Sequence, residues 1–362
     1  MIKRVCIIGG GNLGMALAVE ISRNTEAEIR LLTSKYAIFN ETITSVDTTK
    51  NTSASAKLFC ITDDYAMALA DVDLIFVTVP AFLVQNVIKN MKITKQTTII
   101  LAPGTGGREF HFKNFSDQGH IIAGLDRVPF VARVLEPGKT VVASKKSSIR
   151  FSAMQKTDNS FIEILLTQYL NIQSLAISNY LNITFTPSNQ ILHSTRLYAM
   201  LSGKTINDSF DRYIKFYAEW DDISSEILLS VDYELQNICR AYSLSEVIPL
   251  KIHYESENVQ NLTNKIKSIK SWADINAPFV FKDDKYFVDA ESRYFKEDFP
   301  YGLLIIKDFA IIADINTPII DKILNWYSAF FNLDISSNTK NLSLPRNFGL
   351  KSIQDIHNYY GF

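Results

Sequence analysis

Residues 4–14 read RVCIIGGGNLG, a short run rich in β-branched residues that stops at a cluster of glycines. The run favours a buried parallel strand, and the helix formers at 15–21 favour a helix directly after the last glycine. Gly9, Gly11 and Gly14 satisfy the pattern G-x-G-x-x-G between these two elements. In such a loop the first glycine makes the tight turn, the second lets the backbone approach a pyrophosphate, and the third permits close packing of helix on strand. The stretch therefore predicts a dinucleotide-binding loop, with the helix N-terminus facing the phosphates.

The segments that follow repeat the alternation of strand and helix. Strands are predicted at 28–32, 73–79 and 97–101, and a helix is predicted at 82–90. Strands that alternate with helices form a parallel, doubly wound sheet. The first part of the chain is therefore predicted to be an α/β Rossmann domain.

Further residues of this domain are predicted to contact the cofactor. Asn12 and Leu13 belong to the glycine loop itself. Val79 and Pro80 end the strand at 73–79, and ligands bind at the carboxyl ends of strands in open α/β sheets. These two residues are predicted to border the nicotinamide half of the cofactor, although simple turn chemistry explains them equally well.

The choice between NADH and NADPH depends on the end of the second strand. NAD-preferring sites usually place Asp or Glu about 20 residues beyond the glycine motif, where it bonds the ribose 2′-hydroxyl. That position falls on Thr33, Ser34 and Lys35, which include no carboxylate. Two hydroxyls and a lysine suit a 2′-phosphate, so NADPH is the predicted cofactor. NADH is the alternative if the three residues form an ordinary polar turn.

Beyond about residue 180 the pattern becomes helical. Apolar residues at helical spacing predict a long amphipathic helix from Asp221 onward, with acidic residues at its positive end. A later helix is predicted to begin at 317–318, where a threonine can cap and a proline fits the first turn. The 362 residues are enough for two domains. We expect a Rossmann domain at 1–180 and a mainly α-helical domain at 181–362.

The composition excludes several classes of protein. The 37 basic residues nearly balance the 38 acidic ones, so the chain offers no broad electrostatic footprint for nucleic acid or an anionic membrane. The three cysteines are scattered, and neither a disulfide framework nor a metal site is predicted. No stretch reaches the ~18 consecutive apolar residues of a membrane span, and the N-terminus does not resemble a signal peptide. A cytoplasmic protein is the expectation.

Acid–base chemistry near neutral pH most naturally uses a histidine, and the chain has only five. His193 lies just past the expected domain boundary, although on position alone a structural histidine is the alternative. Arg127 and Arg133 are candidates for the carboxylates of a substrate, since arginine bonds carboxylates bidentately. Surface or salt-bridge roles are the alternative for both. The segment at 291–302 is dense in charged and aromatic residues, which a surface loop would also explain.

Four motifs, taken in order, span nearly the whole chain. They are the glycine loop at 9–14, Asn-x-x-x-His at 189–193, Arg-Tyr-x-x-Glu-Asp-x-Pro-x-Gly at 293–302, and Thr-Pro at 317–318. Their order resembles the octopine/opine dehydrogenase family, whose enzymes reductively condense the amino group of an amino acid with an α-keto acid, often pyruvate, using NAD(P)H. The resemblance implies that His193 is the catalytic acid or base and that Asp298 partners and orients it. It also implies that Arg293 reaches toward the cofactor pyrophosphate.

On this resemblance the chain is predicted to be an NAD(P)-dependent opine dehydrogenase, with 181–362 as its substrate and catalytic domain. Asn189 is assigned to the substrate together with Arg127 and Arg133. The predicted partners are two small molecules, an amino acid and an α-keto acid, and a homodimer stays open. Two alternatives remain. One is an NADP-dependent reductase of a 2-keto or hydroxy acid that uses no amine, and the other is a non-catalytic protein that senses NADPH.

Overall fold

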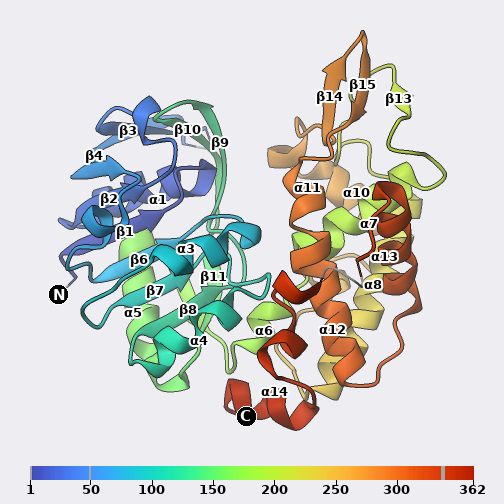
Figure 1. Ribbon diagram of the computed structural model, residues 1–362. Helices are drawn as coiled ribbons and strands as arrows, with labels where there is room; N and C mark the ends of the chain where they lie inside the picture. The colour runs from blue at the N-terminus through green and yellow to red at the C-terminus, as the bar shows by residue number, and fades with distance from the viewer. Residues whose placement is uncertain (1, 49, 336–338) are drawn as a thin grey trace. The chain divides into compact units, whose positions relative to one another are not determined.

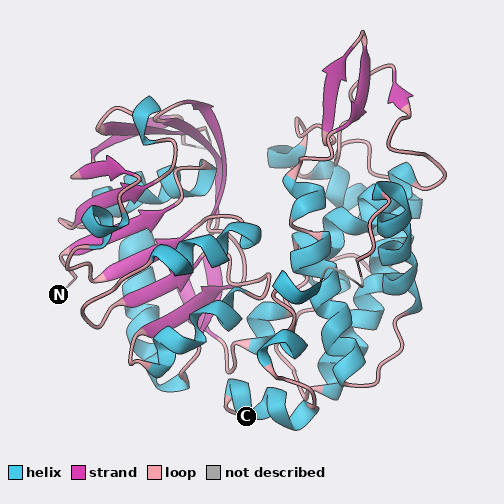
Figure 2. Cartoon of the chain, viewed as in Figure 1, coloured by secondary structure: helices cyan, strands magenta, loops and turns pink. Residues whose placement is uncertain are grey.

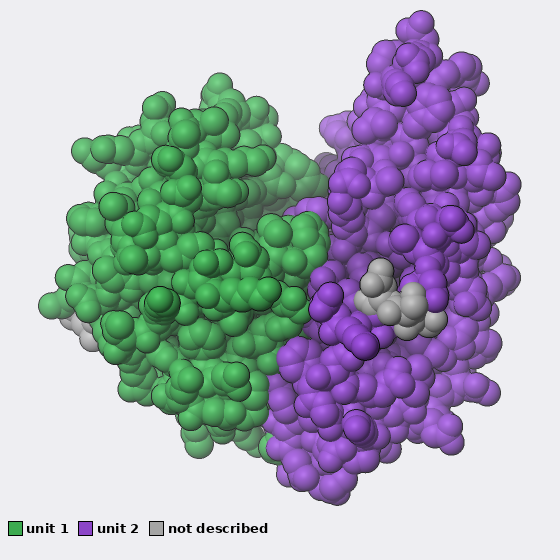
Figure 3. Space-filling view, viewed as in Figure 1, with its two compact units in different colours: residues 1–184, 361 green, residues 185–360, 362 purple. Residues whose placement is uncertain are grey.

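The computed structural model describes residues 2–48, 50–335 and 339–362. The chain forms two compact units, residues 1–184 and residues 185–360, and the last two residues are divided between them (Figure 3). The long sheet lies in the first unit, and helices dominate the second (Figure 2). Each unit therefore has its own structural class.

The first unit is built on an eight-stranded sheet in the order β12-β11-β8-β7-β6-β1-β2-β5 (Figure 1). Its strands are β1 (Arg4–Ile8), β2 (Glu28–Leu32), β5 (Cys60–Thr62), β6 (Leu74–Val77), β7 (Thr98–Leu101), β8 (Ile121–Leu125), β11 (Ser148–Ala153) and β12 (Gln173–Ala176). The six strands from β8 to β5 pair in parallel, and β11 pairs antiparallel with β8. In chain order this parallel part has the 3-2-1-4-5-6 arrangement of dinucleotide-binding sheets. The predicted doubly wound α/β fold is confirmed.

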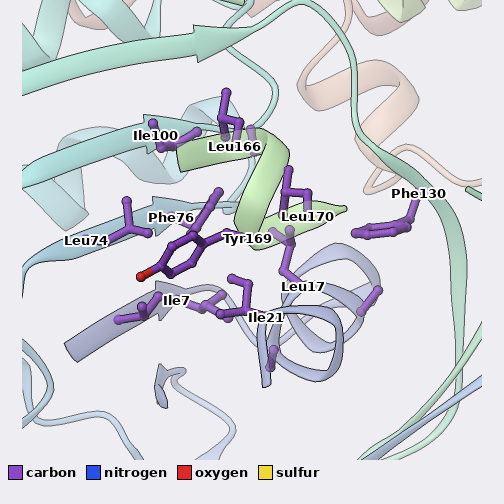
Figure 4. Packing of buried hydrophobic residues seen from close by; sticks show 14 of the residues in the cluster. Ile7, Leu17, Ile21, Leu74, Phe76, Ile100, Phe130, Leu166, Tyr169 and Leu170 are labelled. Carbon is purple, nitrogen blue, oxygen red and sulfur yellow. The ribbon is translucent and has the colours of Figure 1, made fainter. Parts of the chain in front are cut away.

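The core of this unit lies between the sheet and two helices, α1 (Asn12–Asn24) and α5 (Asn159–Leu170). Side chains from the sheet, such as Phe76, meet Leu17 of α1 and Leu166 of α5, and all three are fully buried (Figure 4). Burial of each such side chain contributes on the order of 1.5–3 kcal/mol. The remaining helices of the unit are α2 (Tyr65–Leu69), α3 (Val84–Asn90), α4 (Arg108–Asp117) and α6 (Leu181–Thr184). The core fixes α1 on β1, and with them the loop that joins the two.

A second, four-stranded sheet in this unit was not predicted. Its strands, in spatial order, are β4 (Thr52–Lys57), β3 (Thr42–Asp47), β10 (Lys139–Lys145) and β9 (Phe130–Glu136). The sheet packs against α1. Strand β4 reads TSASAK, with Ala56 as its one buried residue, so it lacks the alternating apolar pattern of a half-buried strand. Such a strand forms because its neighbours pair with it, and the local sequence carries little sign of that pairing.

The second unit is mainly helical, as predicted. Its helices are α7 (Asn189–Leu201), α8 (Asp222–Ala241), α9 (Leu250–His253), α10 (Val259–Ser268), α11 (Arg293–Lys296), α12 (Leu304–Ile312), α13 (Pro318–Phe331) and α14 (Ile353–Tyr360), with a π-helical turn at Phe299–Leu303. A small sheet of β13 (Ser209–Phe210), β15 (Lys285–Val288) and β14 (Phe279–Lys282) was not predicted. Helix α7 packs against α8 and α13, and most of its residues are buried. Among the helices described in either unit, none has the length and hydrophobicity needed to cross a membrane.

The start of α13 differs from the prediction. Pro318 occupies the first turn, as expected, but the Thr317 side chain does not cap the helix. Instead, the carboxylate of Glu234 on α8 accepts hydrogen bonds from the backbone N–H groups of Ile319 and Ile320, at 2.8 and 2.9 Å. A side chain from a neighbouring helix therefore supplies the cap, and the same contact fixes α13 to α8.

Candidate active site

The glycine loop, residues 9–14, turns tightly between β1 and α1. Gly9 adopts a φ of +119°, a conformation that L side chains rarely adopt, and its N–H donates to the carbonyl of Leu32 at 2.9 Å. On the other side of β1, the hydroxyl of Thr78 donates to the carbonyl oxygens of Ile8 and Gly9 at 3.0 and 3.2 Å. The loop is therefore anchored by both strands that flank β1 in the sheet.

The glycines of this loop differ in the room around them. A Cβ at Gly14 would lie 1.8 Å from the carbonyl oxygen of Gly9, so the helix and the strand approach as closely as the motif predicts. A Cβ at Gly11 would meet no protein atom within 4 Å. No side chain caps the N-terminus of α1, and the first-turn N–H groups of a helix attract anions. The open side of the loop fits the pyrophosphate of a dinucleotide.

The side chains of Asn12 and Leu13 contact the protein. Asn12 Oδ1 accepts a hydrogen bond from the backbone N–H of Val134 on β9 at 2.8 Å. Leu13 is half-buried against the core of the first unit. Because these side chains contact the protein, we expect Asn12 and Leu13 to contact the cofactor through their backbone N–H groups.

Thr33, Ser34 and Lys35 follow β2, which lies beside β1. A Cβ at Gly10 would lie 2.8 Å from Thr33 Oγ1, so this threonine adjoins the glycine loop. Ser34 and Lys35 are exposed. The sheet order thus places the three residues at the same edge as the loop, where the ribose of a bound dinucleotide is expected.

Val79 and Pro80 follow β6, which lies on the opposite side of β1. The carbonyl of Val79 accepts a hydrogen bond from Nη1 of buried Arg108 at 2.5 Å, and Arg108 Nε donates to the carbonyl of Thr105 at 3.1 Å. Arg108 therefore joins the loops that follow β6 and β7. Nothing in the sequence pattern indicated this arginine.

Replacing Lys35 with aspartate is expected to reverse the cofactor preference from NADPH to NADH. The new carboxylate would bond a ribose 2′-hydroxyl and repel a 2′-phosphate. Fluorescence titration should show NADPH affinity falling at least about tenfold relative to NADH, equal to about 1.4 kcal/mol. Lys92→Asp makes the same change of charge at an exposed site before β7 and should leave both affinities unchanged. Tighter binding of NADH than NADPH by the unaltered protein would contradict the predicted preference.

His193 is enclosed in the interior of the second unit, on α7. Its Nδ1 lies 2.7 Å from Asp298 Oδ2, and its Nε2 lies 2.7 Å from the hydroxyl of Tyr217. Because an ionised carboxylate only accepts, Nδ1 carries the hydrogen, and Nε2 of the neutral ring accepts from the tyrosine. Phe216 and Tyr294 pack against the ring, with centroids 5.5 and 4.3 Å away. The imidazole is thus held in one tautomer and one orientation.

Asp298 lies 105 residues after His193, just before the π-helical turn. Gly302 allows this segment to approach α7, since a Cβ there would lie 2.4 Å from the Cβ of Gln190. Burial raises the pKa of the Asp298 carboxyl, and the adjoining His193 ring acts against that shift. A carboxylate in this position stabilises the positive charge of the imidazole whenever the ring is protonated.

The other predicted site residues have different surroundings. Arg293 forms an ion pair at 2.5 Å with Glu297, the residue that follows its short helix, and the Arg293 side chain is 62% exposed. Asn189 is exposed at the start of α7, one turn before the imidazole. In the first unit, Arg127 follows β8, whereas Arg133 lies on β9 in the second sheet and is exposed. The structure does not bring the two arginines onto one sheet, and the roles of these four predicted residues stay predictions.

Two residues around the histidine were missed from the sequence, Tyr217 and Arg196. Arg196 is buried, and it donates to the carbonyls of Phe216 and Glu219 at 3.2 and 2.6 Å. It also pairs with Asp221 at 2.7 Å. An arginine three residues after the histidine and directly before Leu197 was the available signal, because a buried charge needs partners. Its partners lie in an irregular segment that no periodicity reveals.

A dinucleotide cradle and a histidine–carboxylate pair are the two parts that an NAD(P)-dependent oxidoreductase with acid–base chemistry requires. The family model of the NAD/NADP octopine/nopaline dehydrogenase alpha-helical domain matches residues 176–331. That of the NAD-dependent glycerol-3-phosphate dehydrogenase N-terminus matches residues 4–115. The second unit is therefore similar to the helical domain of octopine/nopaline dehydrogenases, and the chain is an NAD(P)-dependent oxidoreductase.

Several relatives are similar over most of their length. Octopine dehydrogenase of Pecten maximus is 23% identical, over 90% of this chain and 90% of its own. Opine dehydrogenase of Haliotis discus hannai is 26% identical, again over 90% of each chain. Tauropine dehydrogenase of Arabella iricolor is 25% identical, over 88% of this chain and 89% of its own.

Solved structures confirm the fold. Octopine dehydrogenase with NADH and L-arginine has a TM-score of 0.82 at 21% identity, and the match covers 98% of this chain and 97% of that one. Yersinopine dehydrogenase with NADP+ bound has a TM-score of 0.75 at 14% identity. This match covers 98% of the present chain and 99% of that one. The arrangement of a Rossmann unit followed by a helical unit is therefore common to these proteins and to this chain.

Proposed function

We propose that this protein is an opine dehydrogenase that condenses the amino group of an amino acid with an α-keto acid, pyruvate in the first instance, and reduces the product with NAD(P)H. The observation that carries the proposal is the 2.7 Å contact between His193 Nδ1 and Asp298 Oδ2. The reaction needs a group that takes and gives a proton near neutral pH, and a histidine held by a carboxylate suits both tasks. Relatives named for octopine and tauropine support the substrate class.

The proposed roles follow from the steps of the reaction. His193 takes a proton from the substrate ammonium, so that the amine can attack the keto carbon. It later returns that proton to the hydroxyl of the adduct, so that water leaves and an imine forms. Asp298 fixes the tautomer and stabilises the imidazolium between these two moves. When bound, NAD(P)H supplies the hydride that reduces the imine.

The remaining predicted residues have proposed roles in binding. Arg127 and Arg133 are proposed for the carboxylates of the substrates, and Asn189 for the substrate near the histidine. Arg293 is proposed for the cofactor pyrophosphate. Its side chain is 62% exposed, whereas its present partner Glu297 is 14% exposed, so a phosphate would replace this carboxylate as the partner of the guanidinium. Residues 1–180 are proposed to bind the cofactor and residues 181–362 to carry the acid–base chemistry.

The test is amine dependence. The protein is combined with pyruvate and NADPH or NADH, with and without each member of a panel of amino acids, and nicotinamide oxidation is followed by absorbance. We expect oxidation with at least one amino acid and only background without any, and a secondary amine as the product in mass spectrometry. Oxidation at the same rate without an amine would contradict the proposal and favour a keto acid reductase. A complete lack of oxidation with every pair would contradict it as well.

A further inference from the structure

The ring of His193 is surrounded by protein. Asp298 bonds Nδ1 and Tyr217 bonds Nε2, each at 2.7 Å. Phe216 and Tyr294 pack against the ring, and the histidine is only 7% exposed. Tyr217 is itself 5% exposed, and a proton that Nε2 gives up or accepts along this hydrogen bond passes through its hydroxyl.

Tyr217 is held firmly in this position. Its ring is stacked with that of Trp220 at 6.3 Å and 7°, and it lies 4.6 Å from the ring of Trp272. Arg196 binds the carbonyls of the residues one before and two after the tyrosine. Since Arg196 lies one turn after His193 on α7, the same helix carries the imidazole and the anchor of the phenol. Moving the phenol away from Nε2 would disrupt the aromatic contacts and strain these buried hydrogen bonds.

We propose that Tyr217 exchanges protons directly with the substrate and that His193 acts through it. The proposal rests on the proposed function. When the imidazole is neutral, the hydroxyl hydrogen of Tyr217 points at Nε2. When the imidazole is protonated, Nε2–H points at Oη, and the hydrogen of Oη turns to the reacting atom. The proton passes along this chain without displacement of either ring.

The protons balance along this route. Oη takes one proton from the substrate ammonium as it gives its own to Nε2, and the imidazole becomes imidazolium. The free amine then adds to the keto carbon, and a second nitrogen proton moves to the keto oxygen to form the carbinolamine. In the last step the C–O bond breaks with its electron pair on oxygen, and the nitrogen lone pair forms C=N. The leaving oxygen takes the proton of Oη and departs as water, while Nε2 returns its proton to Oη.

Tyr217→Phe tests this role, because it removes only the hydroxyl and keeps the ring between its two tryptophans. We expect kcat to fall about 10²-fold, the lower end of what positioned proton transfer contributes, with KM nearly unchanged. Tyr198→Phe is the matched control. Tyr198 lies on the same helix, is buried, and packs against Trp326, so its loss of a hydroxyl should leave kcat unchanged. A loss below about tenfold in Tyr217→Phe would overturn the relay.

Two further readouts separate a relay from a structural role. If both residues act in one chain, the double variant of His193→Gln and Tyr217→Phe should be no slower than His193→Gln alone, whereas independent effects would add. In the substrate-free protein with 15N-labelled histidine, Tyr217→Phe should shift the Nε2 resonance of His193. An unchanged Nε2 resonance, or additive losses in the double variant, would overturn the proposal.

The failure of the relay can be told apart from the failure of the proposed function. If pyruvate is reduced without an amine, the proposed function fails. Tyr217→Phe is then measured in that reaction, because the keto oxygen of pyruvate also takes up a proton when it becomes the hydroxyl of the product. If amine-dependent turnover is normal in Tyr217→Phe, only the relay fails. The Nε2 resonance decides whether the hydrogen bond exists even where no substrate pair turns over.

Discussion

We expect the replacement of His193 with glutamine to reduce kcat by at least about 10²-fold. The substitution removes the imidazole, which holds the proton of the substrate ammonium until it is returned. Glutamine is preferred to alanine because its amide can still bond both Asp298 and Tyr217. Neither buried polar group then loses its partner, an event that would cost stability by itself. The glycine loop lies in the other unit, so the affinity for NADPH, measured by fluorescence titration, should equal that of the unaltered protein.

His253→Gln is the matched control for this variant, since His253 is exposed on α9 and has no proposed part in the chemistry. It should retain full turnover and an unchanged melting temperature. If His193→Gln kept a turnover within about threefold of the unaltered protein, the histidine would be structural. A lower melting temperature together with weaker cofactor binding would also remove it from the chemistry. A protein that only senses NADPH would show neither turnover nor any effect of this substitution on binding.

The glycine loop was predictable from the sequence because everything that specifies it is local. The strand, the three glycines and the helix that follows are contiguous at 4–24, and each glycine has its own steric task. The alternation of strands and helices predicted a parallel, doubly wound sheet, since parallel strands with right-handed crossovers allow few arrangements. The polar residues after β2 could be placed for the same reason.

The histidine–carboxylate pair depends on contacts that no local pattern encodes. His193 and Asp298 are 105 residues apart, and only the resemblance to a family linked them before the structure was known. Tyr217 gave no signal, because its position follows from Arg196 and from two tryptophans, Trp220 and Trp272, that no local pattern links to it. The same reason explains why the cap of α13 was assigned to Thr317, since the carboxylate that accepts from its first N–H groups belongs to Glu234 on another helix.

Replacing Gly14 with alanine should destabilise the first unit, although alanine is usually favoured over glycine in a helix by about 1 kcal/mol. The reason is that the added methyl would lie 1.8 Å from the carbonyl oxygen of Gly9 and 3.2 Å from Oγ1 of Thr78. Backbone atoms of the loop must move to make room, and overpacking of this kind typically costs about 1–3 kcal/mol. Thermal unfolding should show a lower melting temperature, and NADPH affinity should fall because the displaced carbonyl belongs to the loop that faces the phosphates.

Gly11→Ala separates the space for the cofactor from the stability of the fold. Its added methyl would meet no protein atom within 4 Å, and Gly11 has an ordinary φ of −89°, so the melting temperature should not change. The methyl would instead occupy the side of the loop that the pyrophosphate approaches, and NADPH affinity should fall at least about tenfold, equal to about 1.4 kcal/mol. The two alanines thus both weaken binding, but only Gly14→Ala weakens the fold. If Gly11→Ala bound NADPH normally, the phosphates would not lie against this glycine, and the placement of the cofactor at the end of β1 would be wrong.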